Sequence, residues 1–374
     1  MDQEKRPIVI LATLLVATIL LSGTYIVMMG GSDDDDSDIE FAQIKDAMNT
    51  TYKFKESPET IISTAPSITE TLYAMGYGDK LIAVSDFTTY PQDAVDRMAL
   101  DSSDPNHLPS MGSYFEPNTE FITDLSADIV FITKTSGSVN VYDSLKDMGQ
   151  TVVMLHQEES IAEIYKNYWL ILTVMNPPSI DMDVTSMMES INPLYDMRDS
   201  IEAVKDKMKT GTTDRQFLIH LGWESDVSQD VWAAGTGNFI TAAAAMANMT
   251  KNTADTPGFA QINKELYIDP ETNPEIIISV GWGWTGWDQS FDDWDTMMDT
   301  LRNDPVWNST NAVKNDQVYV FTERAEEITS RATANAYADL VKLMAMIMQP
   351  QVFTGFTPDK VIGNNYSDMF DGHW

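Results

Sequence analysis

The chain of 374 residues contains no cysteine and few basic residues, with 23 Lys and Arg against 57 Asp and Glu. The absence of cysteine excludes disulfides, thiolate metal sites, iron–sulfur clusters and a lipid-modified cysteine. The formal net charge of −34 argues against nucleic acid as a partner, because a phosphate backbone is bound through clustered Lys and Arg. The hydrophobic content of 43% predicts a folded protein, and the length predicts about two to three domains.

One long apolar run stands near the N-terminus. Ile8–Met29 is uncharged and follows Lys5 and Arg6. At about 1.5 Å per residue it can cross a hydrocarbon core of about 30 Å. Because basic flanks stay cytoplasmic, we expect residues 1–30 to be a single-pass anchor in the cell membrane, with the bulk of the chain extracytoplasmic. The alternative is a cleaved signal peptide, whose apolar region usually has only about 7–15 residues.

An acidic segment follows the apolar run. Asp33–Glu40 predicts a solvated tether, and we expect residues 31–57 to be a linker. Outside the membrane, N-x-S/T sequons become possible glycosylation sites, and four of them begin at Asn49, Asn248, Asn308 and Asn365.

From residue 58 onward, short apolar runs alternate with helical patterns. This alternation predicts an α/β fold with mostly parallel sheets covered by helices on both faces. Ser67 to Glu70 (SITE) matches a capping box and predicts a helix that ends near Gly76. The strands predicted in this first series are Thr60–Ala65, Leu81–Val84, Asp128–Thr133 and Thr151–Leu155, and a further helix is predicted at Ser160–Met175.

A second α/β series predicts a second lobe. Its expected strands are Gln216–Leu221, Glu275–Val280 and Val318–Phe321, and its expected helices are Asn238–Met249 and Ile328–Met348. We expect an N-terminal lobe at 58–180, an inter-lobe helix at 181–211 and a C-terminal lobe at 212–374. The alternative for the connecting region is two helices with a turn at Asn192 and Pro193.

The two lobes share a short pattern. In each, a glycine is followed by Asn-x-Glu and then by a buried strand, and the glutamates of the two copies are Glu120 and Glu265. An internal duplication of an α/β unit would produce this repetition.

Several segments resemble one family of binding proteins. They lie in family order along the chain and are Ile61–Pro91, Met111–Thr133, Ala233–Asn252, Gly258–Ser279 and Asp304–Phe321. Together they are similar to the class III substrate-binding proteins of ABC importers, which carry ferric siderophores, haem or cobalamin. The resemblance implies two Rossmann-like lobes bridged by a long helix, with the ligand in a cleft between the lobes. The membrane anchor and a Trp-rich loop depart from the commonest family pattern.

The resemblance also implies the partners. An ABC permease dimer with its ATPase would receive the ligand from this chain, acting as a monomer without catalysis or a resident cofactor. Glu120 and Glu265 match the family's docking glutamates, which pair with permease arginines. The alternative is that both simply stabilise a helix start through the helix dipole.

We expect the ligand to contact loops at the carboxyl ends of the strands, where open α/β sheets bind ligands. Gly281 to Trp287 (GWGWTGW) is the most informative of these loops, because interleaved Gly and Trp suit flat apolar faces turned to a ligand better than a packed core. The expected ligand-binding residues are Phe87, Tyr90, Met111, Tyr114, Phe115 and Lys134 in the first lobe and Trp223, Trp232, Phe259, Trp282, Trp284, Trp287, Arg324 and Arg331 in the second.

Neither the charged residues nor the spacing of the histidines identifies the ligand. Arg324 and Arg331 could pair with an anionic chelate, and the alternative is ordinary salt bridging to neighbouring glutamates. The four histidines are too scattered for a metal motif, and His220 is expected to be either a pocket member or a core residue. We therefore expect capture of a siderophore, haem or a cobamide. The alternatives are a receptor for a bare transition metal ion, a sensor without a permease, and an extracytoplasmic hydrolase, for which no motif is present.

Overall fold

Two units make up the chain. A computed structural model describes residues 42–135, 137–157, 159–177, 184–209, 215–223, 226–281 and 291–374. Contacts divide the chain into a first unit, Met1–Glu158 with Ala162–Pro193, and a second unit, Glu159–Ile161 with Leu194–Trp374. Each unit is described by itself.

The N-terminal features lie outside this description. The expected anchor at Ile8–Met29 and the acidic stretch Asp33–Glu40 both precede the first described residue. Among the residues that are described, no helix combines the length and the apolar character that crossing a bilayer requires.

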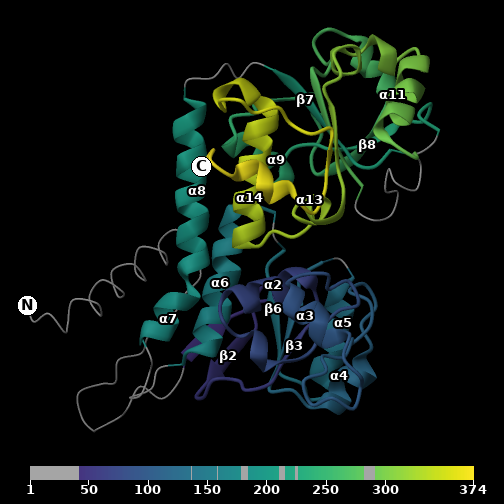
Figure 1. The fold of residues 1–374 in the computed structure, drawn as a ribbon. Helices are drawn as coiled ribbons and strands as arrows, with labels where there is room; N and C mark the ends of the chain where they lie inside the picture. The colour runs from purple at the N-terminus through teal and green to yellow at the C-terminus, as the bar shows by residue number, and fades with distance from the viewer. Residues whose placement is uncertain are drawn as a thin grey trace, which may run out of the picture. The chain divides into compact units, whose positions relative to one another are not determined.

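Parallel strands build the main sheet of the first unit. The described strands follow the order β4-β3-β5-β6, and every residue of β5 and β6 is buried, as in a sheet covered on both faces. The four strands predicted for this lobe are confirmed. The elements are β1 (Ala42–Lys45), β2 (Thr51–Phe54), β3 (Ile61–Ser63), α2 (Pro66–Ala74), η2 (Gly78–Lys80), β4 (Leu81–Ala83), α3 (Gln92–Met98), α4 (Thr119–Leu125), β5 (Ile129–Thr133), α5 (Ser138–Asp147), β6 (Val152–Leu155), α6 (Ile161–Met175) and α7 (Val184–Ser190) (Figure 1).

The hairpin of β1 and β2 corrects the predicted linker at 31–57. Ile44 of β1 is buried, and the backbone N–H of Ala47 donates to the carbonyl of Met154 at 2.9 Å. Asp46 is buried as well, and its carboxylate accepts hydrogen bonds from the N–H of Thr50 and the hydroxyl of Tyr142. The second half of the segment is therefore folded, because one buried carboxylate and a few apolar contacts attach it to the unit.

Two helix starts differ from the sequence prediction. Helix α2 begins at Pro66, and Ala65 occupies the cap position without a side-chain bond, so the predicted capping box at Ser67 is wrong. Proline fits the first helical position because its fixed φ suits a helix start. The predicted helix at Ile328–Met348 is regular only from Ala334, where the Thr333 hydroxyl accepts a bond from the N–H of Ala336.

The expected inter-lobe helix at 181–211 is divided in two. Helix α7 ends at Ser190 and α8 (Asn192–Met208) begins two residues later, with a turn at Ile191. Pro193 stands in the first turn of α8, where a missing N–H removes no helical bond. The boundary between the two units falls directly after this proline.

The sheet of the second unit mixes strand directions. The described strands run β10-β8-β7-β11-β12-β13, with β9 beside β7. The strands β7, β11, β12 and β13 are parallel, whereas β8 is antiparallel to both of its neighbours. The elements are α8, β7 (Gln216–His220), β8 (Val231–Ala234), α9 (Phe239–Met246), β9 (Lys251–Asn252), β10 (Phe259–Ile262), η3 (Lys264–Ile268), β11 (Ile276–Val280), α11 (Trp294–Asn303), η4 (Trp307–Ser309), α12 (Asn311–Lys314), β12 (Val318–Phe321), α13 (Glu323–Glu327), α14 (Ala334–Met348), η5 (Pro350–Val352), β13 (Val361–Ile362) and η6 (Tyr366–Phe370).

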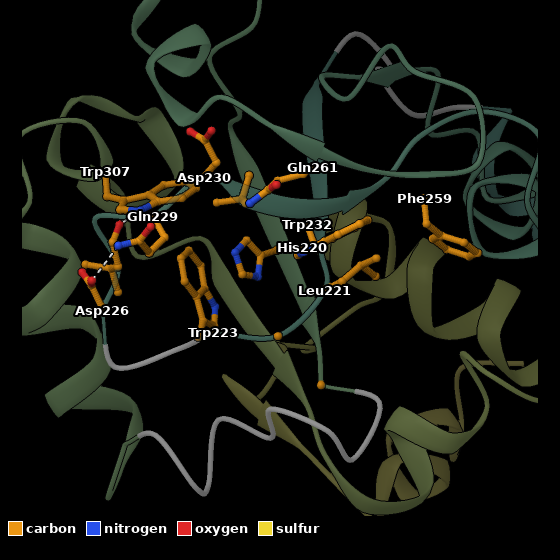
Figure 2. Close-up of a pocket in the computed structure, with 14 residues that line it drawn as sticks. His220, Leu221, Trp223, Asp226, Gln229, Asp230, Trp232, Phe259, Gln261 and Trp307 are labelled. Atoms are coloured by element: carbon orange, nitrogen blue, oxygen red, sulfur yellow. Dashed lines mark hydrogen bonds between the residues drawn. The ribbon is translucent and has the colours of Figure 1, made fainter. Parts of the chain in front are cut away.

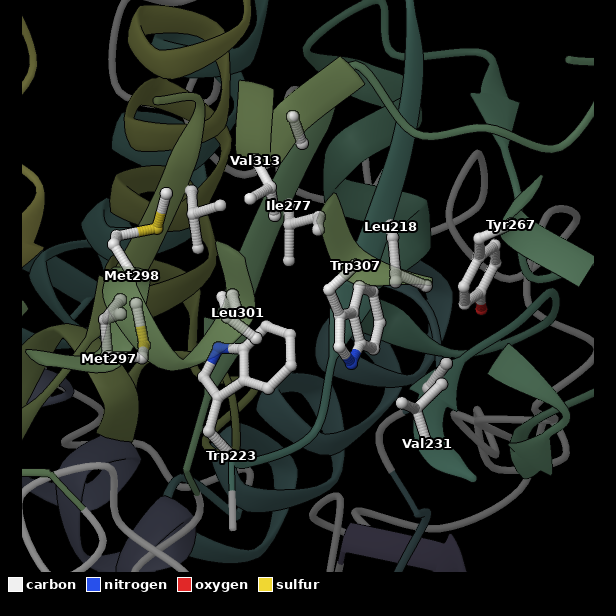
Figure 3. Packing of buried hydrophobic residues seen from close by; sticks show 14 of the residues in the cluster. Leu218, Trp223, Val231, Tyr267, Ile277, Met297, Met298, Leu301, Trp307 and Val313 are labelled. Carbon is white, nitrogen blue, oxygen red and sulfur yellow. The ribbon is translucent and has the colours of Figure 1, made fainter. Parts of the chain in front are cut away.

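Helices cover this second sheet on both faces. On one face, Leu218 and Ile277 pack with Leu301 of α11 and Val313 of α12 in a buried cluster (Figure 3). On the other side of the sheet, α9 and α14 lie side by side (Figure 1). The predicted strands β7, β11 and β12 are confirmed, and the α/β class is confirmed for both units.

The excess of acidic residues makes a prediction about stability. A net charge of −34 opposes a compact state through self-repulsion. Raising NaCl from 10 mM to 1 M shortens the Debye length from about 30 Å to about 3 Å. We expect the melting temperature in calorimetry to rise, by about 2–4 °C for each kcal/mol of repulsion relieved. The same titration at pH 4, where many carboxylates are protonated, serves as the control and should show a smaller rise. A melting temperature that does not respond to salt at pH 7 would contradict this expectation.

Candidate functional site

A pocket of about 780 Å³ lies at the carboxyl edge of the sheet in the second unit (Figure 2). His220 ends β7 and Gly281 follows β11, so both stand where parallel strands finish. Trp232 of β8 and Phe259 of β10 also line the pocket. Open α/β sheets bind ligands at this edge because successive loops converge there. The pocket therefore occupies the position that the strand topology predicts.

Strand alternation gives neighbouring side chains of β8 different exposure, although both Val231 and Trp232 line the pocket. Val231 and Ala233 are buried, while Trp232 between them is 53% exposed. Trp232 lies opposite Gln261 of β10 in the antiparallel register, and both residues line the pocket. This pair places a flat apolar face beside an amide, which suits a ligand that has both kinds of surface.

Three aromatic rings pack beneath this surface. The rings of His220 and Trp223 are stacked with centroids 3.8 Å apart, and Trp307 meets Trp223 edge-on at 4.9 Å. Figure 2 shows His220 and Trp223 side by side. Trp223 is only 1% exposed and belongs to the buried cluster of the unit, so it supports the pocket more than it covers a ligand.

Burial keeps the imidazole of His220 neutral. Loss of solvation lowers the pKa of His220 to about 3, and its Nδ1 has no hydrogen-bond partner among the described residues. Of the two expectations for His220, pocket member and core residue, the structure supports both, because the side chain is buried and also lines the pocket.

Acidic and amide groups form the polar side of the pocket. Asp226 accepts hydrogen bonds from the Ser228 hydroxyl at 2.5 Å and from Nε2 of Gln229 at 2.8 Å (Figure 2). These bonds lower the pKa of Asp226 to about 2, so it is charged at neutral pH. Asp230 adds a second carboxylate to the lining. The described lining contains no Lys or Arg, and this side of the pocket is therefore anionic.

A smaller pocket, of about 250 Å³, lies in the first unit beyond the carboxyl end of β5. Tyr114 and Phe115 line it. The Phe115 ring packs edge-on against Tyr114, with centroids 5.1 Å apart, and against Phe87 at 6.0 Å. Phe87, Tyr90 and Phe115 are all exposed. Four of the residues predicted for the first lobe therefore present aromatic surface at this end of the unit.

The other two residues predicted for the first lobe, Met111 and Lys134, make contacts within the protein. Met111 is fully buried in the core of the unit, so it offers no surface to a ligand and the prediction for it is wrong. Lys134 is exposed, and its Nζ donates to the carbonyl of Ala47 at 3.1 Å, which attaches it to the end of the β1–β2 hairpin.

Both predicted arginines make ion pairs with one carboxylate. Glu327 accepts from Arg324 at 3.2 Å and from Arg331 at 2.9 Å. The two guanidinium side chains are largely buried. The alternative of ordinary salt bridging is confirmed for both, and neither lines the pocket of the second unit.

Most of the Trp-rich loop predicted at Gly281 to Trp287 lies outside the described residues. Trp282, Trp284 and Trp287 lie outside the described residues, and Gly281 before them lines the pocket. Sequence reasoning missed the pocket residues Asp226, Gln229, Asp230, Gln261 and Trp307. The first three lie in a polar run soon after β7. A rule that selects polar as well as aromatic residues in the loops after strands would have found them.

The two predicted docking glutamates occupy equivalent local structures. Glu120 is in the first turn of α4, where the Asn118 side chain accepts a bond from the N–H of Phe121. Glu265 is in the first turn of η3, where the Asn263 side chain accepts from the N–H of Glu265 itself. Both glutamates are exposed. Each is therefore available to a partner, and each also fits the alternative of a stabilised helix start.

The buried His220 predicts a pH dependence of stability. Because the folded-state pKa lies below the ordinary value of 6.5, the unfolded chain binds one proton more between about pH 6.5 and pH 3. Stability should fall as the pH falls through this window, by up to about 1.4 kcal/mol per pH unit. In urea unfolding followed by Trp fluorescence, His220→Phe should lose less stability than the wild type between pH 7 and pH 5.

A higher pH range supplies the control. Between pH 8 and pH 9, above the ordinary pKa of 6.5, His220 is neutral in the folded and the unfolded chain, so the stabilities of the wild type and of His220→Phe should change in parallel. Equal pH dependence of the wild type and His220→Phe between pH 7 and pH 5 would show that His220 does not remain neutral in the folded state.

The second unit matches a known family. The profile of the periplasmic binding protein family matches residues 194–325, which include the strands that line the pocket. An uncharacterised ABC transporter substrate-binding lipoprotein of Bacillus subtilis is 24% identical, over 82% of this chain and 87% of the relative. A cobalamin-binding protein of Halobacterium salinarum is also 24% identical, over 63% of this chain, and the match spans 57% of that relative's length.

A solved structure shares the fold. The vitamin B12 binding protein of Vibrio cholerae superimposes with a TM-score of 0.57 and 20% identity, over 78% of this chain and 97% of that structure. The profile match over residues 194–325 and the shared fold bear out the resemblance to periplasmic binding proteins that the sequence indicated.

Proposed function

We propose that the chain is the extracytoplasmic substrate-binding component of an ABC importer, and that it captures a corrinoid. The observation that carries the proposal is the 780 Å³ pocket at the carboxyl edge of the sheet, which combines exposed aromatic faces with amides and carboxylates. A binding protein needs only such a preorganised surface, because it changes no covalent bond in its ligand. Relatives named for cobalamin and vitamin B12 binding support the same class of ligand.

The charge of the pocket favours a corrinoid over the other chelates. Haem and many ferric siderophores carry carboxylates or other anionic groups, which would need cationic partners. Asp226 and Asp230 give the described lining the opposite charge. The periphery of a corrinoid consists mainly of carboxamides, which are neutral and both donate and accept hydrogen bonds. Such groups can pair with these carboxylates and with Gln261 without charge repulsion.

The partners and the location follow from the same assignment. The ligand would pass to a permease dimer driven by its ATPase, with Glu120 and Glu265 as the contacts on the two units. The segment Ile8–Met29 would keep the binding protein at the membrane, in the role that the lipid serves in a lipoprotein relative. The aromatic surface formed by Phe87, Tyr114 and Phe115 is a second candidate for ligand contact.

The pocket predicts the effect of removing Trp232. In a fluorescence titration with cyanocobalamin, Trp232→Ala should weaken the affinity at least about tenfold, because buried aromatic contacts are the usual energetic centres of a binding surface. Ile268 offers a matched control. It is also 53% exposed and belongs to the same unit, but it does not line the pocket. Ile268→Ala should bind cyanocobalamin like the wild type.

The same titration separates the ligand classes. Haem, a carboxylate ferric siderophore and Zn²⁺ alone should each bind the wild type more weakly than cyanocobalamin does. Tighter binding of haem or the siderophore would replace the corrinoid as the ligand and leave the importer role intact. Tight binding of Zn²⁺ alone would favour the bare-metal receptor instead.

The docking role predicts a separation of binding from transport. Glu120→Arg and Glu265→Arg should each leave the cyanocobalamin affinity unchanged, because both side chains are on the surface and neither lines a pocket described above. Uptake of labelled cyanocobalamin by cells that depend on the variant should be lost, since each glutamate would meet a permease arginine.

Aspartate at the same positions is the matched control for charge. Glu120→Asp and Glu265→Asp keep the carboxylate and should retain most of the uptake. Normal uptake by both arginine variants would leave the two glutamates with only a structural role at helix starts.

A further inference from the structure

A buried lysine lies one residue before the exposed Glu265. Nζ of Lys264 donates to the carbonyl of Val227 at 2.8 Å and to Oδ2 of Asp304 at 2.6 Å. The Lys264 and Asp304 side chains are only 9% and 10% exposed. Burial opposes the charged form of Asp304, but its bonds from Lys264 and from the N–H of Trp307 hold its pKa below the usual value. The two side chains are therefore paired with each other inside the protein.

The network extends to a third segment of the chain. Nε1 of Trp307 donates to the same Val227 carbonyl at 3.1 Å, so that carbonyl accepts two hydrogen bonds from different elements. Oδ1 of Asp304 accepts from the N–H of Val306 and Trp307, which holds the start of η4. The loop at 226–230, the turn η3 and the turn η4 are thus joined at one buried point.

One end of this network is the wall of the pocket. Val227 and Trp307 both line the pocket, and Val227 directly follows Asp226 in the chain. Trp307 packs between Trp223 and Tyr267, with ring centroids 4.9 Å and 5.8 Å away (Figure 3). A displacement of the loop would therefore be transmitted to the ammonium of Lys264 and to the ring of Trp307.

The other end is an exposed turn. In η3, Lys264 and Tyr267 point inward and are buried, whereas Glu265, Leu266 and Ile268 are exposed. Five consecutive residues thus include two that are attached to the pocket side and three that face solvent. In so short a turn the inward and outward side chains cannot move independently, because they share one backbone segment.

We propose that Lys264 is a positioning residue that couples the pocket to the exposed face of η3. A ligand that contacts the loop at 226–230 would set the presentation of Glu265, and a partner bound at Glu265 would change the hold on the ligand by the same factor. The part that concerns a partner rests on the proposed docking role of Glu265. The link between loop and turn is a property of the chain alone.

A double variant isolates the coupling from the loss of a buried ion pair. Lys264→Met with Asp304→Asn removes both charges and leaves an amide oxygen that can still accept from Val306 and Trp307, so no lone buried carboxylate remains. In ligand-free protein, hydrogen–deuterium exchange at residues 226–230 and 264–268 should accelerate at least about fivefold over the wild type, while exchange in β7 and β11 stays unchanged. Unchanged exchange in the loop and the turn would overturn the proposal.

Ligand binding tests the transmission. With cyanocobalamin as the probe, binding to the wild type should slow exchange at η3, and binding to the double variant should not. The variant should also bind cyanocobalamin about 5–10-fold more weakly. Lys264→Arg, which keeps a buried donor, should retain more of the affinity than the double variant. Glu271→Gln, which changes an exposed residue of the same unit outside η3 and outside the pocket, should leave the affinity unchanged. Slowed exchange at η3 in the double variant would overturn the coupling.

The two proposals fail in different ways. If the wild type does not bind cyanocobalamin, the corrinoid assignment fails, and the exchange of the ligand-free double variant still decides whether Lys264 links the loop to the turn. If cyanocobalamin binds but η3 exchange in the wild type does not respond, the function stands and the coupling fails.

Discussion

The parallel pairing of β7 with β11 is the constraint on which the rest of the second unit depends. Its register sets His220 beside Ser279, so both strands finish at the same edge of the sheet. The loop that follows each strand must then begin at that edge, and the pocket forms there because loops from neighbouring strands converge. The antiparallel strands β8 and β10 widen the same edge and bring Trp232 and Gln261 to it.

The pocket combines two kinds of surface that arise from different physical causes. Its aromatic base, with His220 stacked on Trp223, is an extension of the hydrophobic core, and burial keeps the imidazole uncharged. Its acidic side is a surface loop in which hydroxyl and amide donors stabilise the carboxylate of Asp226. Lys264 connects the aromatic base with the acidic loop. Its ammonium donates to the Val227 carbonyl of that loop from the buried side, so its positive charge does not face the ligand.

The sequence predicted the regular elements well and their edges less well. Apolar runs such as those of β5, β11 and β12 are long and uninterrupted, so their period and burial were readable without tertiary contacts. The hairpin of β1 and β2 was hidden, because its few buried residues follow an acidic stretch and are held by contacts from Tyr142 and Met154, distant in the chain. The sequence predicts Met111 as a pocket residue for a similar reason, because the contacts that make it part of the core come from residues distant in the chain, such as Ile62 and Val130.

Composition and local pattern by themselves determined the α/β class, the two series of strands and helices, the family resemblance and the two glutamates at helix starts, because each depends on near neighbours in the chain. Only the tertiary structure decided which side chains meet. It paired both arginines with Glu327, buried Trp223, and gathered Asp226, Asp230 and Gln261 into one pocket. Those contacts join residues from separate strands and loops, and their energies depend on burial and on hydrogen-bond geometry that exist only once the sheet has formed.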